Sequence, residues 1–188
     1  MLRSTALLAL TALIAWHAPT AHATVARPLT YENLTREADV VIHGVVVDQK
    51  SFWGAKRERI YTHTEVSVWR TLKGKTDQTT LVVRQWGGAA EGAVMPIPGN
   101  AQLKVGEEVV LFLTRDARHH FVVGLSQGKF SLRADAAGGK LAYRDLSGLT
   151  FARWSPQGKM TLTKRWALDQ PISLDDLESA IKRANTAR

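Results

Sequence analysis

The sequence predicts a mainly β domain in which five antiparallel strands form a barrel, with a short helix before them and a second helix after them. Three observations predict this fold class. Segments rich in Val and Ile alternate between apolar and polar residues, as strands with one buried face do. Gly and Pro interrupt these segments at short intervals, which favours strands joined by turns. Near the C-terminus, apolar residues recur at helical spacing instead.

Residues 1–23 are typical of a cleavable signal peptide. Arg3 supplies a positive charge, and the apolar run from Ala6 to Trp16 is shorter than the roughly 20 residues that span a bilayer. Ala21-His22-Ala23 is a small-x-small cleavage signal. We therefore expect an exported chain, periplasmic or extracellular, that begins at Thr24 and keeps no transmembrane segment. A retained membrane anchor is the alternative.

Charge and composition narrow the possible chemistry. Without Arg3 the chain holds 24 Lys and Arg against 17 Asp and Glu, and the densest basic stretch, Lys56-Arg57-Glu58-Arg59, is broken by a glutamate. Scattered charge of this kind is typical of a solvated surface, and export argues against nucleic acid as a partner. The chain contains no Cys, which excludes disulfides, thiol catalysis and Cys-ligated zinc.

The start of the domain, residues 24–37, is expected to be a lead followed by a helix at 29–37. Thr30 can cap this helix, and Leu29 and Leu34 can close it as a hydrophobic staple. The barrel is expected in residues 38–133, where β-branched and aromatic residues concentrate. Its strands are predicted at residues 38–47, 59–72, 81–86, 109–113 and, in two pieces, 121–125 and 128–132.

Residues 87–104 are predicted to form a long loop, because Gly and Pro are too frequent there for a regular element. A connection of about 20 residues without regular structure is uncommon in a compact domain and is often functional or mobile. Trp86 at its base and Trp53 on an earlier loop could stack on a sugar ring or anchor a partner. Capping of the barrel ends is the alternative.

The last part, residues 134–188, is expected to add short strands around 141–143 and 160–166 and a helix at 173–185. Ser173 can cap this helix. One apolar stripe follows the helix, and we expect it to pack on the outside of the barrel. The stripe consists of Leu174, Leu177, Ile181 and Ala184.

A hairpin of the first two strands, centred near Trp53, predicts which side chains share a face. It places Val46 opposite Ile60, and Ile42 opposite Thr64, on an apolar face. The opposite, mixed face then carries His43, Tyr61, His63, Glu65 and Trp69. Large aromatic residues on such a face contact either another segment of the chain or a partner.

Several short motifs resemble those of known proteins. Ala38-Asp39-Val40-Val41-Ile42-x-Gly-x-Val after a short helix, and a second strand ending Leu72-Lys73-Gly74, resemble the netrin-like domain, the OB-type barrel of the tissue inhibitors of metalloproteinases. Lys104-Val105-Gly106-Glu107-Glu108-Val109-Val110-Leu111-Phe112-Leu113, followed by Gln127-Gly128-Lys129-Phe130, resembles a group of exported bacterial proteins. The resemblance covers about residues 29–133 and implies a five-stranded OB-type barrel. The cysteine at the N-terminus of those inhibitors has no counterpart at Thr24, so the resemblance does not carry over protease inhibition by that route.

No arrangement of residues in the sequence indicates catalysis, a cofactor or a metal. There is no Gly-x-Ser-x-Gly elbow and no His-Glu-x-x-His motif, and Gly87-Gly88-Ala89-Ala90-Glu91-Gly92 lacks the Lys-Ser ending of a phosphate loop. His43 and His63 lie opposite each other in the predicted hairpin register, but on a face where a histidine needs no ligand role. His119 and His120 are expected in a turn.

The function we predict is therefore a non-enzymatic, exported binding module for a protein partner, in an inhibitor-like or accessory role. A module that binds carbohydrate or another envelope polymer is the alternative, because OB-type barrels bind polymers across their second and third strands. A hydrolase is a third possible function. The predicted recognition surface consists of Tyr61, His63 and Trp69, with Trp53 and Trp86 at its rims.

N-terminal sequencing of the native exported protein is expected to begin at Thr24, within a residue or two, because signal peptidases cut after small-x-small sequences. An intact Met1 on that protein would contradict both cleavage and the compartment inferred from it.

Overall fold

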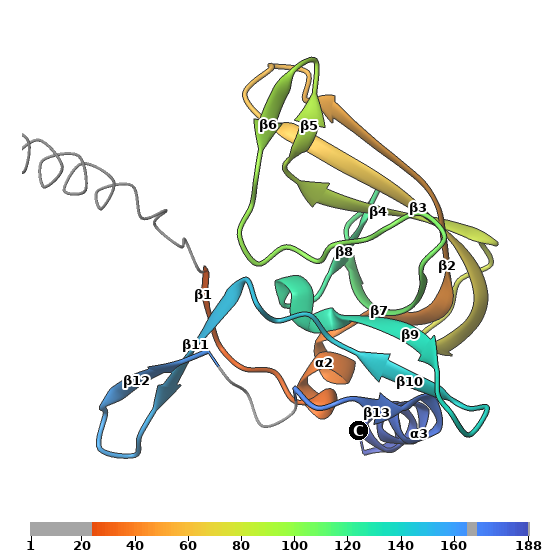
Figure 1. The fold of residues 1–188 in the computed structure, drawn as a ribbon, viewed down its shortest axis with the longest axis vertical. Helices are drawn as coiled ribbons and strands as arrows, with labels where there is room; N and C mark the ends of the chain where they lie inside the picture. Colours follow the sequence, from red (N-terminus) through yellow and green to blue (C-terminus); the bar gives the residue numbers. More distant parts are fainter. Residues whose placement is uncertain (1–23, 165–168, 188) are drawn as a thin grey trace, which may run out of the picture.

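The computed structural model describes residues 24–164 and 169–187, so the predicted signal peptide lies outside the described residues. The protein is mainly β, as the sequence predicts (Figure 1). Its elements in chain order are β1 (Thr24–Ala26), α2 (Tyr31–Glu37), β2 (Val40–Trp53), β3 (Ile60–Lys73), β4 (Thr80–Trp86), β5 (Gly88–Ala90), β6 (Ala93–Met95), β7 (Glu108–Arg115), β8 (His120–Val122), the 3-10 helix η1 (Leu125–Gly128), β9 (Lys129–Ala134), β10 (Lys140–Tyr143), β11 (Leu149–Trp154), β12 (Met160–Thr163), β13 (Ile172–Ser173) and α3 (Leu174–Thr186).

Three sheets organise these strands. The main sheet has eight strands in the order β13-β10-β9-β7-β2-β3-β4-β8, and β8 pairs with β7 as well as with β4. A second sheet has the order β1-β11-β12, and β5 and β6 form a two-stranded hairpin. Figure 1 shows the β5–β6 hairpin beside the free end of the long β2–β3 hairpin, far from α2 and α3.

The paired strands β2 and β7 separate two hydrophobic cores. All residues from Val109 to Leu113 are buried, and their side chains alternate between the two sides. Val110 and Phe112 pack with Phe130 and the helices, whereas Leu111 packs with the inner residues of β3 and β4. Because both faces are covered, these strands are continuously apolar in sequence.

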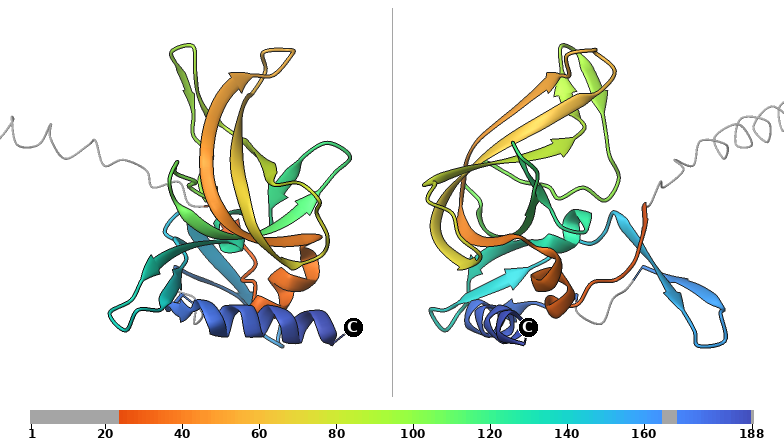
Figure 2. Two further views of the ribbon diagram at one scale, coloured as in Figure 1. Left: turned by 90° about the vertical axis from the view of Figure 1, so that its right-hand side faces the viewer. Right: turned by 180° about the vertical axis from the view of Figure 1, so that it is seen from behind.

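The predicted register of the β2–β3 hairpin is wrong. Trp53 pairs with Ile60, and Val46 pairs with Val66. β2 continues six residues beyond the predicted strand, so the turn of the hairpin lies after Trp53 and not around it. Register shifts after Val41, His43 and Val46 change the pairing further, so that His43 lies opposite Arg70 and not opposite His63. Irregularities of this kind bend and coil a hairpin, and Figure 2 shows β2 and β3 curving strongly along their length.

Gly44 is the glycine of the first strand motif, and its surroundings explain why a glycine occupies this position. A Cβ atom at this position would lie 2.1 Å from the backbone oxygen of Ser67 on β3. The two strands therefore approach too closely for any side chain at the site of the shift. The Gly of the Ile42-x-Gly-x-Val motif thus has a packing role.

Both predicted helices are present, and their caps are confirmed. Thr30 accepts a hydrogen bond from the Asn33 backbone, and Ser173 accepts one from the Asp176 backbone. The buried Lys73 Nζ donates to the carbonyl oxygens of Thr35 and Ala38, at the end of α2. α3 packs against α2, and its Leu177 and Ile181 enter the core behind β7. Among the described residues, no helix is long and apolar enough to span a membrane.

Three segments contain strands that the sequence did not predict. The loop of residues 87–104 begins with the β5–β6 hairpin, and residues 24–26 of the predicted lead form β1, parallel to β11. β11 itself has no sequence counterpart in the predicted strands. Residues 165–166 of the strand predicted at 160–166 lie outside the described residues, and β12 ends at Thr163.

Leu177→Ala is expected to lower the free energy of unfolding by about 2–5 kcal/mol, because a fully buried side chain leaves a cavity when it is truncated. Urea unfolding measures this loss. Leu162→Ala is the matched control, since Leu162 is 55% exposed and its truncation should change stability by less than about 0.5 kcal/mol. Equal effects of the two substitutions would contradict the packing of α3.

Candidate functional site

Three of the predicted site residues lie together on the outer face of β3 and β4. Tyr61 is opposite Trp86 in the strand register, and His63 is opposite Arg84. Thr62 between them is buried and faces the other way, so Tyr61 and His63 point outward. We define the arginine–aromatic face as Phe52, Arg59, Tyr61, His63, Arg84 and Trp86.

Arginines lie over the aromatic rings of this face. The Arg84 guanidinium is 3.9 Å from the centroid of the Tyr61 ring, and the Arg59 guanidinium is 4.9 Å from that of Trp86. Trp86 is nevertheless 54% exposed. Cation–π contacts of this kind hold the long arginine side chains over the rings.

His63 lies in the middle of this face, where Phe52 contacts it edge-on with the two ring centroids 4.7 Å apart. His119, on the connection between β7 and β8, lies 5.4 Å from it between ring centroids. Burial lowers the pKa of His63, and the nearby charges of Arg84 and His119 lower it further. Its Nε2 atom is buried without a hydrogen-bond partner among the described residues.

Trp53 and Trp69 lie away from the arginine–aromatic face. Trp53 pairs with the inward-facing Ile60, and its ring stacks under Arg57, which forms an ion pair of 2.6 Å with Glu91. Trp69 follows Tyr61 by eight residues, about 26 Å along an extended strand. The structure thus brings three of the five predicted residues together and separates the other two from them.

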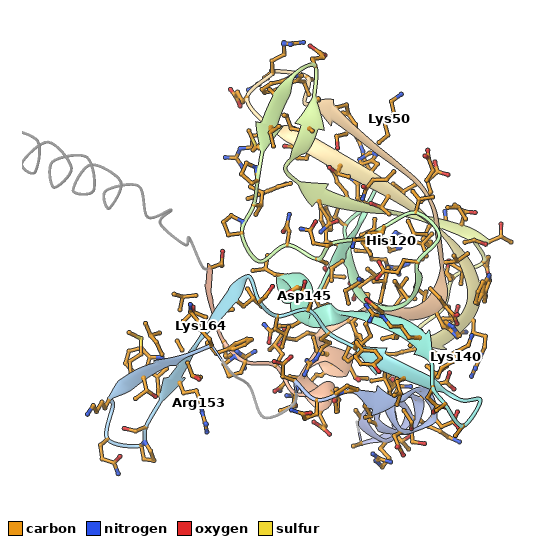
Figure 3. The ribbon with its side chains drawn as sticks, in the orientation of Figure 1. Lys50, His120, Lys140, Asp145, Arg153 and Lys164 are labelled. Atoms are coloured by element: carbon orange, nitrogen blue, oxygen red, sulfur yellow. The ribbon has the colours of Figure 1, made fainter. Side chains whose placement is uncertain are left out.

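Trp69 belongs to a different cluster, at the far end of β3. It is 52% exposed, and its ring lies 5.5 Å from that of the buried His43. His43 Nε2 lies 2.7 Å from a Glu108 carboxylate oxygen, which also accepts a 2.5 Å hydrogen bond from Lys140. Burial alone would raise the pKa of Glu108, but the hydrogen bonds from Lys140 and His43 lower it overall. Lys140, the first residue of β10, is labelled in Figure 3.

A polar cleft of about 700 Å³ lies on the inner side of the same strands. Ser51 and Thr62 line it from β2 and β3, and Lys129 and Ser131 line it from β9. The chain after β6 closes one side of the cleft and is held there by a hydrogen bond from Gln85 to the Ala101 carbonyl oxygen. The exposed Trp86 lies at the rim, so it borders both the cleft and the arginine–aromatic face.

Charged and hydroxyl groups meet at the base of this cleft. Lys129 Nζ lies 2.6 Å from a Glu107 carboxylate oxygen and donates to Ser131 Oγ at 2.7 Å, and Ser131 donates to the same carboxylate. Burial alone would raise the pKa of Glu107, but hydrogen bonds from Lys129 and Ser131 lower it overall. Ser126 also lines the cleft, and its Oγ atom is buried without a hydrogen-bond partner among the described residues.

Sequence reasoning missed this cluster, although both of its charged residues stand in motifs noted for their resemblance. Glu107 belongs to Val105-Gly106-Glu107, and Lys129 belongs to Gln127-Gly128-Lys129-Phe130. Those motifs are 22 residues apart, and the pairing of β7 with β9 brings them together. The signal in the sequence that could have indicated this ion pair was a Glu in one motif and a Lys in the other.

The remaining groups with potential chemical reactivity are the His, Asp and Glu side chains and the Ser131 hydroxyl. Across residues 24–164 and 169–187, no three His, Asp or Glu side chains gather closely enough to hold a metal ion. The Ser131 hydroxyl already donates to Glu107 and accepts from Lys129. No model of a known protein family matches the chain, and no curated protein sequence matches it either.

The pKa of His63 is expected to be below the usual value near 6.5, and Arg84→Met should raise it, because the substitution removes one of the charges that oppose protonation. The unfolded chain binds this proton more readily than the folded one, so the stability that the neutral imidazole contributes is lost as pH falls below about 6.5. Imidazole NMR titrations of both proteins measure the shift.

Arg133→Met provides the control for that titration, because Arg133 stacks on Tyr143 of β10 and is absent from the causes of the His63 shift. A His63 pKa at or above 6.5, or one that Arg84→Met leaves unchanged, would show that burial and Arg84 do not act on this imidazole as described.

Proposed function

We propose that the protein is an exported, non-enzymatic binding module that recognises a protein partner through the arginine–aromatic face. The observation that carries this proposal is the pair of stacks in which Arg84 covers Tyr61 and Arg59 covers Trp86. Trp, Tyr and Arg are the residues most enriched among the energetic hot spots of protein interfaces. Here they form one outward surface on two paired strands, whose rigidity limits the entropy lost on binding.

The strand pairings support the OB-type barrel that we propose for the central strands. The pairs β2–β3, β3–β4, β4–β8, β8–β7 and β7–β2 follow one another in a closed order, and β4–β8 is the parallel pair. Barrels of this type bind ligands across their second and third strands. β3 and β4 hold these places here, and the netrin-like resemblance agrees with this order.

The charge around the face favours a partner that presents carboxylates. Lys50, which points outward from β2 in Figure 3, lies opposite His63 in the register. Arg59 and Arg84 add two further basic side chains at this end of the sheet, where Glu91 already forms an ion pair with Arg57. The carboxylates of Asp48 and Glu65 lie opposite each other two positions further along the strands. Complementary charge of this kind raises the rate of association and selects between partners.

A second function, binding of a carbohydrate or another envelope polymer, is favoured by the polar cleft. Its walls combine hydroxyl and amide side chains with the partly buried Glu107–Lys129 ion pair, and the exposed ring of Trp86 borders it. Sugars are bound by such hydrogen-bonding groups together with an aromatic platform.

Photo-crosslinking tests the first function. With a benzophenone amino acid in place of Tyr61, the protein in its native cells is expected to give one discrete protein adduct, and the added change Arg84→Glu should reduce its yield more than tenfold. Tyr143 is the matched control position, because it also lies under an arginine but on β10. The change Arg133→Glu is the matched charge control.

Equal adducts from positions 61 and 143, or an adduct that Arg84→Glu leaves unchanged, would refute recognition by this face. Thermal melting of each variant separates binding from folding. No adduct, together with saturable binding of a neutral oligosaccharide to the purified protein, would establish the second function in place of the first.

A further inference from the structure

The β1–β11–β12 sheet has an apolar face that no described residue covers. Trp154 pairs with Met160, Ala152 pairs with Leu162, and Thr150 pairs with Val25, so side chains at these positions share one face. The large apolar members are highly exposed: Val25 56%, Trp154 69%, Met160 48% and Leu162 55%. Scattered exposed apolar residues are ordinary, but adjacent ones on one sheet face mark an interaction surface.

The opposite face of this sheet is already used by the fold. Phe151 and Leu149 of β11 are buried and pack with Leu146 in a third small core, which Ala26 of β1 also contacts. This packing fixes which face of the sheet points away from the molecule. The alternate residues Thr150, Ala152 and Trp154 of β11 therefore lie on the face that points away from this core.

The charge of this segment is of one sign. Residues 146–164 contain Arg153, Lys159 and Lys164 but no Asp or Glu, although carboxylates are common elsewhere in the chain. All three basic side chains are exposed. Figure 3 shows Arg153 and Lys164 on the sheet that projects from the body of the protein.

The sheet also has the position that docking on a flat surface needs. Figures 1 and 2 show the β11–β12 hairpin extending beyond the rest of the protein, away from the β2–β3 hairpin. Its tip carries Trp154 and Met160 on adjacent strands. A flat surface can therefore contact the tip without meeting the arginine–aromatic face.

We propose that this sheet docks on the surface of an anionic phospholipid bilayer. Trp154, Met160 and Leu162 enter the boundary between headgroups and acyl chains, where an indole ring is favoured. Lys159, in the turn of the hairpin, and Lys164, which follows Leu162 by two residues and so shares its face, bind the lipid phosphates. Each basic residue near such a surface strengthens binding roughly fivefold. This proposal does not depend on the partner proposed above.

Sedimentation with lipid vesicles tests the proposal. The purified exported chain is expected to bind vesicles of equal parts phosphatidylcholine and phosphatidylglycerol, to bind pure phosphatidylcholine at least tenfold more weakly, and to be released by salt. The double change Trp154→Ser and Leu162→Ser should weaken binding at least tenfold while the melting temperature stays unchanged, since both side chains are exposed. Lys159→Gln should weaken it about fivefold.

Trp86→Ser is the matched control, because it removes an exposed Trp of the arginine–aromatic face and should leave vesicle binding unchanged. Absence of binding to the anionic vesicles would overturn the proposal, as would equal losses from the control and the double change. A wild-type dimer in light scattering that the double change dissociates, without vesicle binding, would assign the face to a second copy of the chain instead.

Discussion

The pairing of β2 with β7 is the constraint on which the rest of the structure depends. From Val40 to Val46 and from Val109 to Leu113 nearly every residue is buried, so both faces of this pair must be covered. One face is covered by α2 and α3, and the other by the inner residues of β3 and β4. Without cysteine, the fold depends on these two cores, since the hydrophobic effect is the dominant favourable term in folding.

The register shifts between β2 and β3 determine how the outer residues are grouped. A regular hairpin would align every second residue of β3 along one flat face. The shifts near Gly44 and Val47 coil the hairpin instead, so that one end of β3 presents Tyr61 and His63 while the other end presents Trp69 beside His43. Two separate clusters result from a sequence in which these residues look like members of one set.

The mainly β character of the fold and the elements with a strong local signal could be predicted from the sequence. Period-two alternation gave the central strands, and the side chains of Thr30 and Ser173 gave the helix starts, because both signals act within a few residues. The hairpin register could not be predicted, since the shifts depend on the close approach of Gly44 to Ser67. The same holds for the Glu107–Lys129 pair and for β1, whose partner β11 lies more than a hundred residues away in sequence.

The two candidate sites share strands, and this sharing explains why the outward side chains are held in place. Thr62 lies between Tyr61 and His63, and its hydroxyl contacts Ser51 Oγ at 2.8 Å and donates to the Gly87 carbonyl oxygen at 2.7 Å. These inward hydrogen bonds tie β3 to β2 and to the start of the 87–104 segment. Tyr61 and His63 therefore project from a backbone that is fixed from behind, and a partner that binds them has little chain entropy to remove. The polar lining of the cleft thus stabilises the outer face whether or not the cleft itself holds a ligand.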